Sequence, residues 1–146
     1  MVGETLMYPQ EAEAILVAAE MEGATCAMYT FTMQGDGSLF SGAEAGPVLR
    51  SLEEAGAAAV GFNCVAADSF TPALVAKLRR VLKGPILCKP NAGVPVIGED
   101  NLPHYPMEPE EFGDILAQCR NMGATVFGGC CGTDPRFIAA VKERLG

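Results

Sequence analysis

A repeating pattern of apolar stretch, loop, amphipathic helix and glycine constrains the fold of this chain more than any other feature. Gly23-Ala24, Gly56-Ala57 and Gly123-Ala124 each precede an apolar stretch, and Gly84-Pro85 precedes a fourth. A glycine in this place is typical of a helix that ends in a left-handed residue. Strands and helices that alternate in this way predict right-handed βαβ units and a parallel sheet.

The pattern predicts five βα units in one domain that spans residues 1–146. The first strand is a stub at Met1 to Glu4, and the other strands are expected at residues 25–31, 58–62, 86–89 and 125–127. Helices are expected at residues 9–21 and 46–55, after Thr71 as an N-cap, from Pro109, and from Asp134-Pro135. Ile138, Val141 and Leu145 are expected to form the buried face of the last helix.

Two architectures fit this α/β pattern: an open doubly wound sheet, or part of a (β/α)8 TIM barrel. A whole barrel takes about 250 residues, and this chain has 146. The chain is therefore too short to form a complete barrel by itself.

Composition and charge exclude two classes of partner. The formal net charge is −8, and lysine and arginine form no stripe, so binding to a nucleic-acid backbone is not expected. The apolar stretches are far shorter than a membrane span. Residues 1–8 have neither a basic nor an apolar signal region, which predicts a cytoplasmic protein.

Six cysteines are present, and clustered cysteines in a cytosolic chain indicate a metal or catalytic site more often than disulfides. Cys64 follows one predicted strand, and Cys130 and Cys131 follow another. Ligands bind at the carboxyl ends of parallel strands. Three thiolates suit zinc and leave a fourth coordination position for substrate. The alternative is that all three are small buried apolar residues.

The remaining cysteines and the single histidine provide a comparison. Cys119 lies on the apolar stripe of a predicted helix, and Cys26 and Cys88 lie within predicted strands, where packing explains them. His104 lies in a long proline-rich loop, residues 90–108. We expect it to be a loop residue rather than a fourth zinc ligand.

Four blocks of this sequence resemble the homocysteine S-methyltransferase family. They are Glu4-Thr5-Leu6, Gly61-Phe62-Asn63-Cys64, the block from Lys89 to Pro95, and Gly128-Gly129-Cys130-Cys131-Gly132-Thr133. The resemblance implies a (β/α)8 barrel of which this chain is the second half. The glycine-rich motif on the first strand of the family, which lines the homocysteine pocket, has no counterpart here.

The resemblance also implies roles for individual residues. Cys64, Cys130 and Cys131 would bind zinc, Glu4 would hold the amino group of homocysteine, and Asn63 and Asn91 would support the site by hydrogen bonding. The structural alternatives are that Glu4 caps the first helix and that both asparagines form turns.

The function implied is zinc-dependent activation of the homocysteine thiolate for methyl transfer, which gives methionine. The methyl donor would be a methyl-corrinoid, a methylfolate derivative, betaine or S-methylmethionine. The alternative is a zinc-binding half-barrel module without turnover that serves a methyltransferase or corrinoid system. A half barrel has two open sheet edges, so we expect a homodimer or higher oligomer that covers them. The other possibility is a separate subunit that carries the first half of the barrel.

Overall fold

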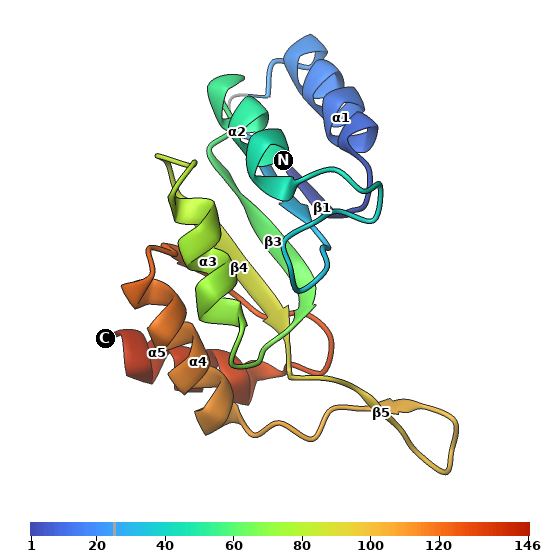
Figure 1. Ribbon diagram of the computed structural model, residues 1–146, viewed down its shortest axis with the longest axis vertical. Helices are drawn as coiled ribbons and strands as arrows, with labels where there is room; N and C mark the ends of the chain where they lie inside the picture. The colour runs from blue at the N-terminus through green and yellow to red at the C-terminus, as the bar shows by residue number, and fades with distance from the viewer. Residues whose placement is uncertain (25) are drawn as a thin grey trace.

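The computed structural model describes residues 1–24 and 26–146 and shows one parallel sheet with helices packed against it (Figure 1). The sheet has five strands in the order β1-β2-β3-β4-β7. Their bounds are β1 Val2–Leu6, β2 Met28–Phe31, β3 Ala59–Ala66, β4 Ile86–Asn91 and β7 Val126–Phe127. The helices are α1 Pro9–Met21, α2 Ala45–Glu54, α3 Thr71–Arg79, α4 Pro109–Asn121 and α5 Pro135–Leu145.

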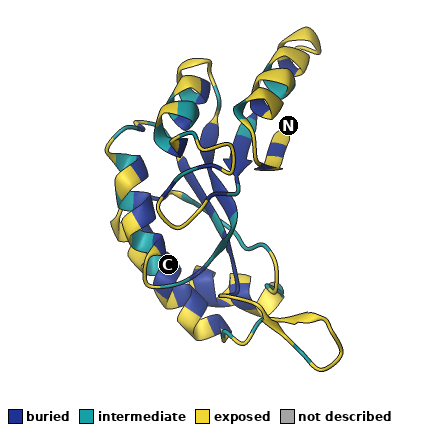
Figure 2. Cartoon of the chain, turned by 45° about the vertical axis from the view of Figure 1, so that its right-hand side comes forward, coloured by how far each residue is buried: buried dark blue, intermediate teal, exposed yellow. Residues whose placement is uncertain are grey.

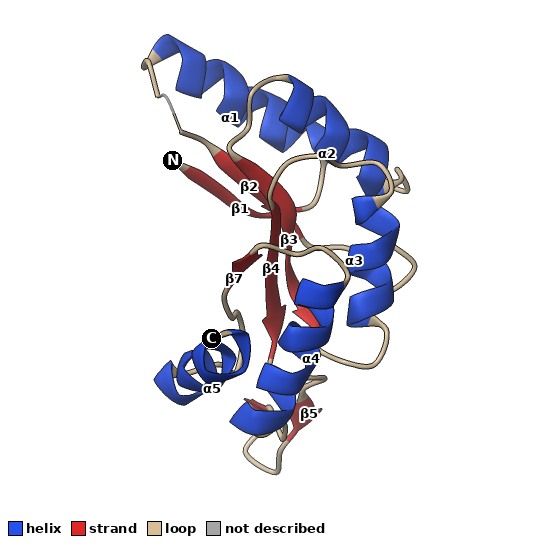
Figure 3. Cartoon of the chain, turned by 90° about the vertical axis from the view of Figure 1, so that its left-hand side faces the viewer, coloured by secondary structure: helices blue, strands red, loops and turns tan. Residues whose placement is uncertain are grey.

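The predicted α/β fold with a parallel sheet is confirmed, and the doubly wound alternative is wrong. The strand order follows the chain, without the reversal that a doubly wound sheet has. Figure 3 shows α1, α2, α3 and α4 along one side of the sheet, and α5 packs against α4. Every neighbouring pair of strands in this sheet is parallel, so all carboxyl ends meet at one edge.

The observed strands differ from the prediction mainly in length. β1 runs to Leu6 instead of ending as a stub, and β3 and β4 extend beyond the predicted ends through Cys64 and Asn91. β2 begins at Met28, and the predicted residue Thr25 lies outside the described residues. Cys26, expected within a strand, lies before β2 and is exposed.

Local sequence signals explain where the helices begin. Asp134 caps α5, because its Oδ1 accepts a hydrogen bond of 2.8 Å from the backbone N–H of Arg136. Thr71 was predicted as an N-cap but is the first residue of α3. The carboxylate of Asp68 takes the capping role instead, since it accepts from the backbone N–H groups of Phe70 and Thr71.

Three of the four predicted glycine helix ends have the expected left-handed backbone. The φ angles are 66° at Gly23, 94° at Gly56 and 108° at Gly123. Gly84 does not have a positive φ, so that prediction was wrong. Its backbone N–H is instead bonded to the carboxylate of Glu53, which fixes the turn by side-chain capping.

The core lies between the sheet and the helix faces turned toward it, as the buried residues in Figure 2 show. Phe112 on α4 and Phe137 on α5 are both buried and meet edge to face, with ring centroids 5.4 Å apart. Ile138 was predicted to be buried but is 47% exposed. Val141 is buried as predicted, and Leu145 packs partly buried against the core, while Phe137 and Ala140 complete the inward face of α5.

The two long loops differ in structure. Residues 90–108 contain a short antiparallel hairpin that the sequence analysis did not predict, formed by β5 Val96–Ile97 and β6 Pro103–His104. This hairpin extends away from the sheet (Figure 1). The second long loop, residues 34–44 between β2 and α2, is rich in glycine and is held by a bridge between Ser38 and Glu44. In the part of the chain that is described, no helix is long and apolar enough to cross a membrane.

The Phe112–Phe137 contact joins α4 to the helix that follows the cysteine pair. We predict that Phe137→Ala lowers the free energy of unfolding by about 3–5 kcal/mol, because it leaves a cavity in a closely packed core. Urea denaturation measures this loss. Ile138→Ala is the matched control on the exposed side of α5 and should change stability by no more than about 0.5 kcal/mol. Equal losses in both variants would contradict the observed orientation of α5.

Candidate metal centre

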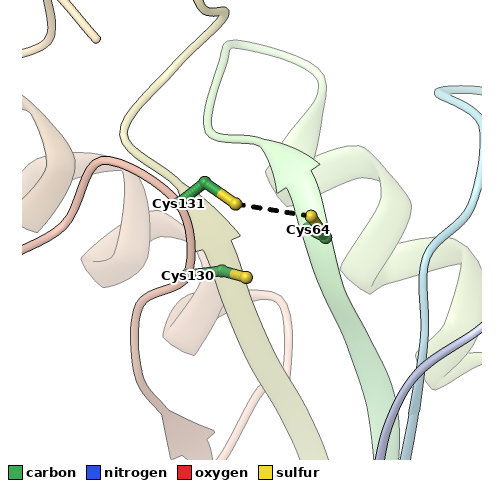
Figure 4. A group of neighbouring side chains, drawn as sticks. All are labelled: Cys64, Cys130 and Cys131. Atoms are coloured by element: carbon green, nitrogen blue, oxygen red, sulfur yellow. Dashed lines mark hydrogen bonds between the residues drawn. The ribbon is translucent and has the colours of Figure 1, made fainter. Parts of the chain in front are cut away.

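Three cysteine sulfurs from two separate segments meet at the carboxyl edge of the sheet. Cys64 lies on β3, while Cys130 and Cys131 lie in the turn between β7 and α5. Their sulfur atoms all lie within 4.8 Å of one another. Figure 4 shows the three side chains pointing toward a common region, with the Sγ atoms of Cys64 and Cys131 3.7 Å apart.

An irregularity in β3 aims Cys64 at this region. The pairing of β3 with β4 shifts register between Asn63 and Ala66, and Cys64 has a left-handed backbone with φ 57°. Such bulges change the direction of a side chain at the end of a strand. A left-handed backbone is uncommon for a residue other than glycine, and it is often found at functional sites.

The turn that carries the other two cysteines is bonded to the end of β4. The Cys130 N–H donates to the Pro90 carbonyl at 2.9 Å, and the Ala92 N–H donates to the Cys131 carbonyl at 2.9 Å. The Cys131 N–H donates to Oδ1 of Asn91 at 3.0 Å. These three bonds fix the turn against the strand that lies between β3 and β7.

Asn63 connects the cysteine cluster to the first strand. Its side chain is fully buried, and its Oδ1 accepts from the Thr5 N–H at 3.0 Å. Its Nδ2 donates to Oγ1 of Thr5 at 2.6 Å and lies 3.7 Å from Sγ of Cys130. Asn63 therefore holds β1 and one sulfur in fixed relation.

Glycines and the start of α5 shape the rest of the turn. A side chain on Gly129 would collide with Thr133, and one on Gly132 would collide with Tyr105. The hydroxyl of Thr133 donates to the Cys130 carbonyl at 2.7 Å. α5 begins at Pro135, so the positive end of its dipole lies close to the cysteine pair.

Burial and the crowding of the thiols together govern the electrostatics of the cluster. Burial, together with the neighbouring thiols of Cys131 and Cys130, raises the pKa of Cys64 to about 12. Burial and the thiol of Cys131 also raise the pKa of the Tyr105 hydroxyl. Without a cation, Cys64 therefore stays protonated at neutral pH, and a metal must displace its proton to bind.

The donor set and its spacing fit zinc. Zinc bonds to cysteine sulfur at about 2.3 Å, so two sulfurs of a tetrahedral site lie about 3.8 Å apart. The Cys64–Cys131 separation of 3.7 Å agrees with this edge. Three cysteines leave one position open to substrate. The three sulfurs all lie within 4.8 Å of one another, so the set is grouped closely enough to approach a single ion.

The structure places the other predicted residues as follows. Glu4 lies on β1 and forms an ion pair with Lys89 on β4. It does not cap the first helix; Glu11 does, by accepting from the N–H groups of Met7 and Tyr8. His104 is in the hairpin beside Asp100, away from the cysteine cluster. Cys88 and Cys119 are buried in the core.

Sequence reasoning gave no role to three residues that contact the site or its supports. Thr5 bonds Asn63, Tyr105 packs over Gly132, and Lys89 pairs with Glu4. Thr5 and Lys89 stand inside the sequence blocks that were compared with the family, so position within a block was the available signal. Tyr105 belongs to the long loop and offered no such signal.

Comparisons with known proteins agree with this geometry. The chain matches the homocysteine S-methyltransferase family over residues 1–145. Homocysteine S-methyltransferase of Escherichia coli strain K12 is 32% identical over 145 residues, which cover 97% of this chain and 46% of that protein. Methionine synthase of Mycobacterium tuberculosis is 33% identical over 115 residues, 78% of this chain and 10% of that protein.

Solved structures give the same result. The homocysteine methyltransferase MmuM from Escherichia coli, in its metallated form, superposes with a TM-score of 0.79 at 28% identity. The match covers 98% of this chain and 44% of that one. The chain therefore spans about half the length of the single-function relatives that it matches. On the family match over nearly its whole length, the chain belongs to the homocysteine S-methyltransferase family.

Proposed function

We propose that this chain activates the thiol of homocysteine at a zinc site formed by Cys64, Cys130 and Cys131 and transfers a methyl group to it, giving methionine. The convergence of the three sulfurs within 4.8 Å carries this proposal. Family membership favours the transferase over a zinc-binding module without turnover.

The chemistry is alkyl transfer to sulfur. A free thiol has a pKa of about 8.5 and is mostly protonated at neutral pH. Zinc bound to the three cysteines would keep the substrate thiol deprotonated in the open position. The substrate sulfur then forms a bond to the methyl carbon of the donor. The bond from that carbon to the donor breaks, and its electron pair leaves with the donor.

The residues around the cluster have supporting roles in this proposal. Asn63 and Asn91 hold the cysteines in place through the hydrogen bonds to Cys130 Sγ and the Cys131 N–H. Glu4 would bind the ammonium group of homocysteine. β1 brings Glu4 near the cluster, because the next residue, Thr5, is bonded to Asn63.

We further propose that the chain is half of a (β/α)8 barrel and pairs with a second copy. Helices on one side of a parallel sheet in sequential order are the arrangement of a barrel arc. β1 and β7 are the edges of the five-stranded sheet and would present unpaired backbone groups. A second copy would supply two further sheet edges, and pairing of the edges would close the barrel.

The zinc assignment predicts a difference between two single cysteine variants. Cys130→Ala should abolish stoichiometric zinc, because two thiolates hold the ion much more weakly than three. Cys119→Ala is the matched control, since Cys119 lies on α4 and is buried in the hydrophobic core. Elemental analysis of the purified proteins measures the ratio. Equal zinc in both variants would overturn the ligand assignment.

Homocysteine binding to the zinc-loaded protein should release about one proton per site at pH 7, because a thiol with a pKa of about 8.5 must ionise to bind zinc. Titration in weakly buffered solution with a pH indicator measures this release. With betaine or S-methylmethionine added in parallel, mass spectrometry follows methionine. Cys131→Ala should show neither proton release nor product, and proton release from that variant would contradict the mechanism.

The pairing of barrel halves predicts a dimer or larger assembly at micromolar concentration by sedimentation velocity. Val2→Lys should shift the chain toward monomer, because Val2 lies on the edge strand β1 and is 49% exposed. Val96→Lys changes an equally exposed valine in the hairpin, at 58%, and should leave the assembly intact. A monomeric wild-type chain would refute edge pairing.

A further inference from the structure

Lys89 stands on the row of the sheet that supports the cysteine cluster. It pairs in register with Asn63 across β3 and β4, and Asn63 lies 3.7 Å from Sγ of Cys130. Its neighbour Cys88 belongs to the core on the helix side. Because side chains alternate along a strand, Lys89 faces the opposite side of the sheet from the helices.

The side chain of Lys89 extends over the face of the sheet to reach Glu4. Its Nζ forms an ion pair with Oε1 of Glu4, although β3 and β2 lie between their strands. Gly128 makes room for the first part of the side chain, since a Cβ there would lie 3.0 Å from Cγ of Lys89. A positive and a negative group therefore stand together beside the row that carries Asn63.

This ion pair can open to admit a ligand. The side chains of Lys89 and Glu4 are 24% and 41% exposed, and pairs with this much access to water are held weakly. An incoming ligand that carries both charges would replace each lost partner. When the two charges of the ligand replace the Lys89–Glu4 pair, no charge is left unpaired. The free-energy cost of opening the pair at a partly buried site is then low.

An α-amino acid has these two charges on a single carbon atom. In the function proposed above, the ammonium group of homocysteine takes Glu4, which leaves Lys89 without its partner. From this geometry we propose that Lys89 binds the α-carboxylate of the substrate. The inference rests on the proposed function and extends it, because it names the group that recognises the other half of the zwitterion.

Thr30 provides a second observation on the same side of the sheet. Its neighbours Tyr29 and Phe31 belong to the helix-side core, so Thr30 faces the other way. Its side chain is fully buried, and within the described part of the chain its hydroxyl has no hydrogen-bond partner. Gly3 pairs with Tyr29 and Leu6 with Phe31 across a register shift, so Thr30 lies opposite Glu4 and Thr5 on β1. The strand that carries Glu4 therefore lies beside a buried polar atom without a partner.

Three thiol compounds test the two charged groups of the substrate separately in a binding experiment on the zinc-loaded chain. Homocysteine carries both charges, 4-mercaptobutanoate only the carboxylate, and 3-mercaptopropylamine only the ammonium. Lys89→Met should lower the affinity for homocysteine and for 4-mercaptobutanoate by about tenfold or more. The same variant should bind 3-mercaptopropylamine at least as tightly as the wild type, which also shows that its metal site is intact. Proton release on titration measures all three affinities.

Lys83→Met is the matched control, because Lys83 is exposed and precedes the opposite end of β4. It should leave all three affinities unchanged. If Lys89→Met weakened the binding of all three thiols alike, or left the affinity for homocysteine unchanged, the role of Lys89 would be overturned. The proposed function would still stand. Failure of the wild-type chain to bind any of the thiols would overturn the proposed function itself.

Discussion

The hydrogen bonds between the end of β4 and the turn after β7 are the interaction on which the whole site depends. They place Cys130 and Cys131 beside β4, and the parallel pairing of β3 on its other side brings Cys64 to the same edge. No segment of local sequence contains all three sulfurs. The cysteine cluster is therefore a product of strand order, and any change that moves β7 relative to β4 would separate the cysteine pair from Cys64.

Charge explains why a cation would stabilise three ionised thiols at this point. The chain has a net charge of −8, and three thiolates at one point would add to the repulsion. Burial and its neighbours raise the pKa of Cys64 to about 12, so this thiol keeps a proton that a divalent ion would displace. The amino end of α5 lies close to the cysteine pair, and Asn63 donates a hydrogen bond to Sγ of Cys130.

Polar groups of β1 and β4 stand together on the face of the sheet that the helices leave open. The chain spans about half the length of the homocysteine methyltransferases of Escherichia coli that it matches. In the proposal above, recognition of both charges of an amino acid depends on groups from these two strands. The Glu4–Lys89 pair places such groups together on the open side of the sheet.

The sequence by itself determined the α/β class and the helix starts at Pro9 and Pro109, because glycine and proline signals and apolar periodicity are local. It pointed to the three cysteines through the general rule that the carboxyl ends of parallel strands meet at one edge of the sheet. It did not determine the lengths of β3 and β4, the inward face of α5 or the hairpin in the long loop, since these depend on packing partners distant in the chain. Only the tertiary structure decided that Glu4 meets Lys89 across two intervening strands. Such a contact depends on strand order and register, which no local pattern encodes.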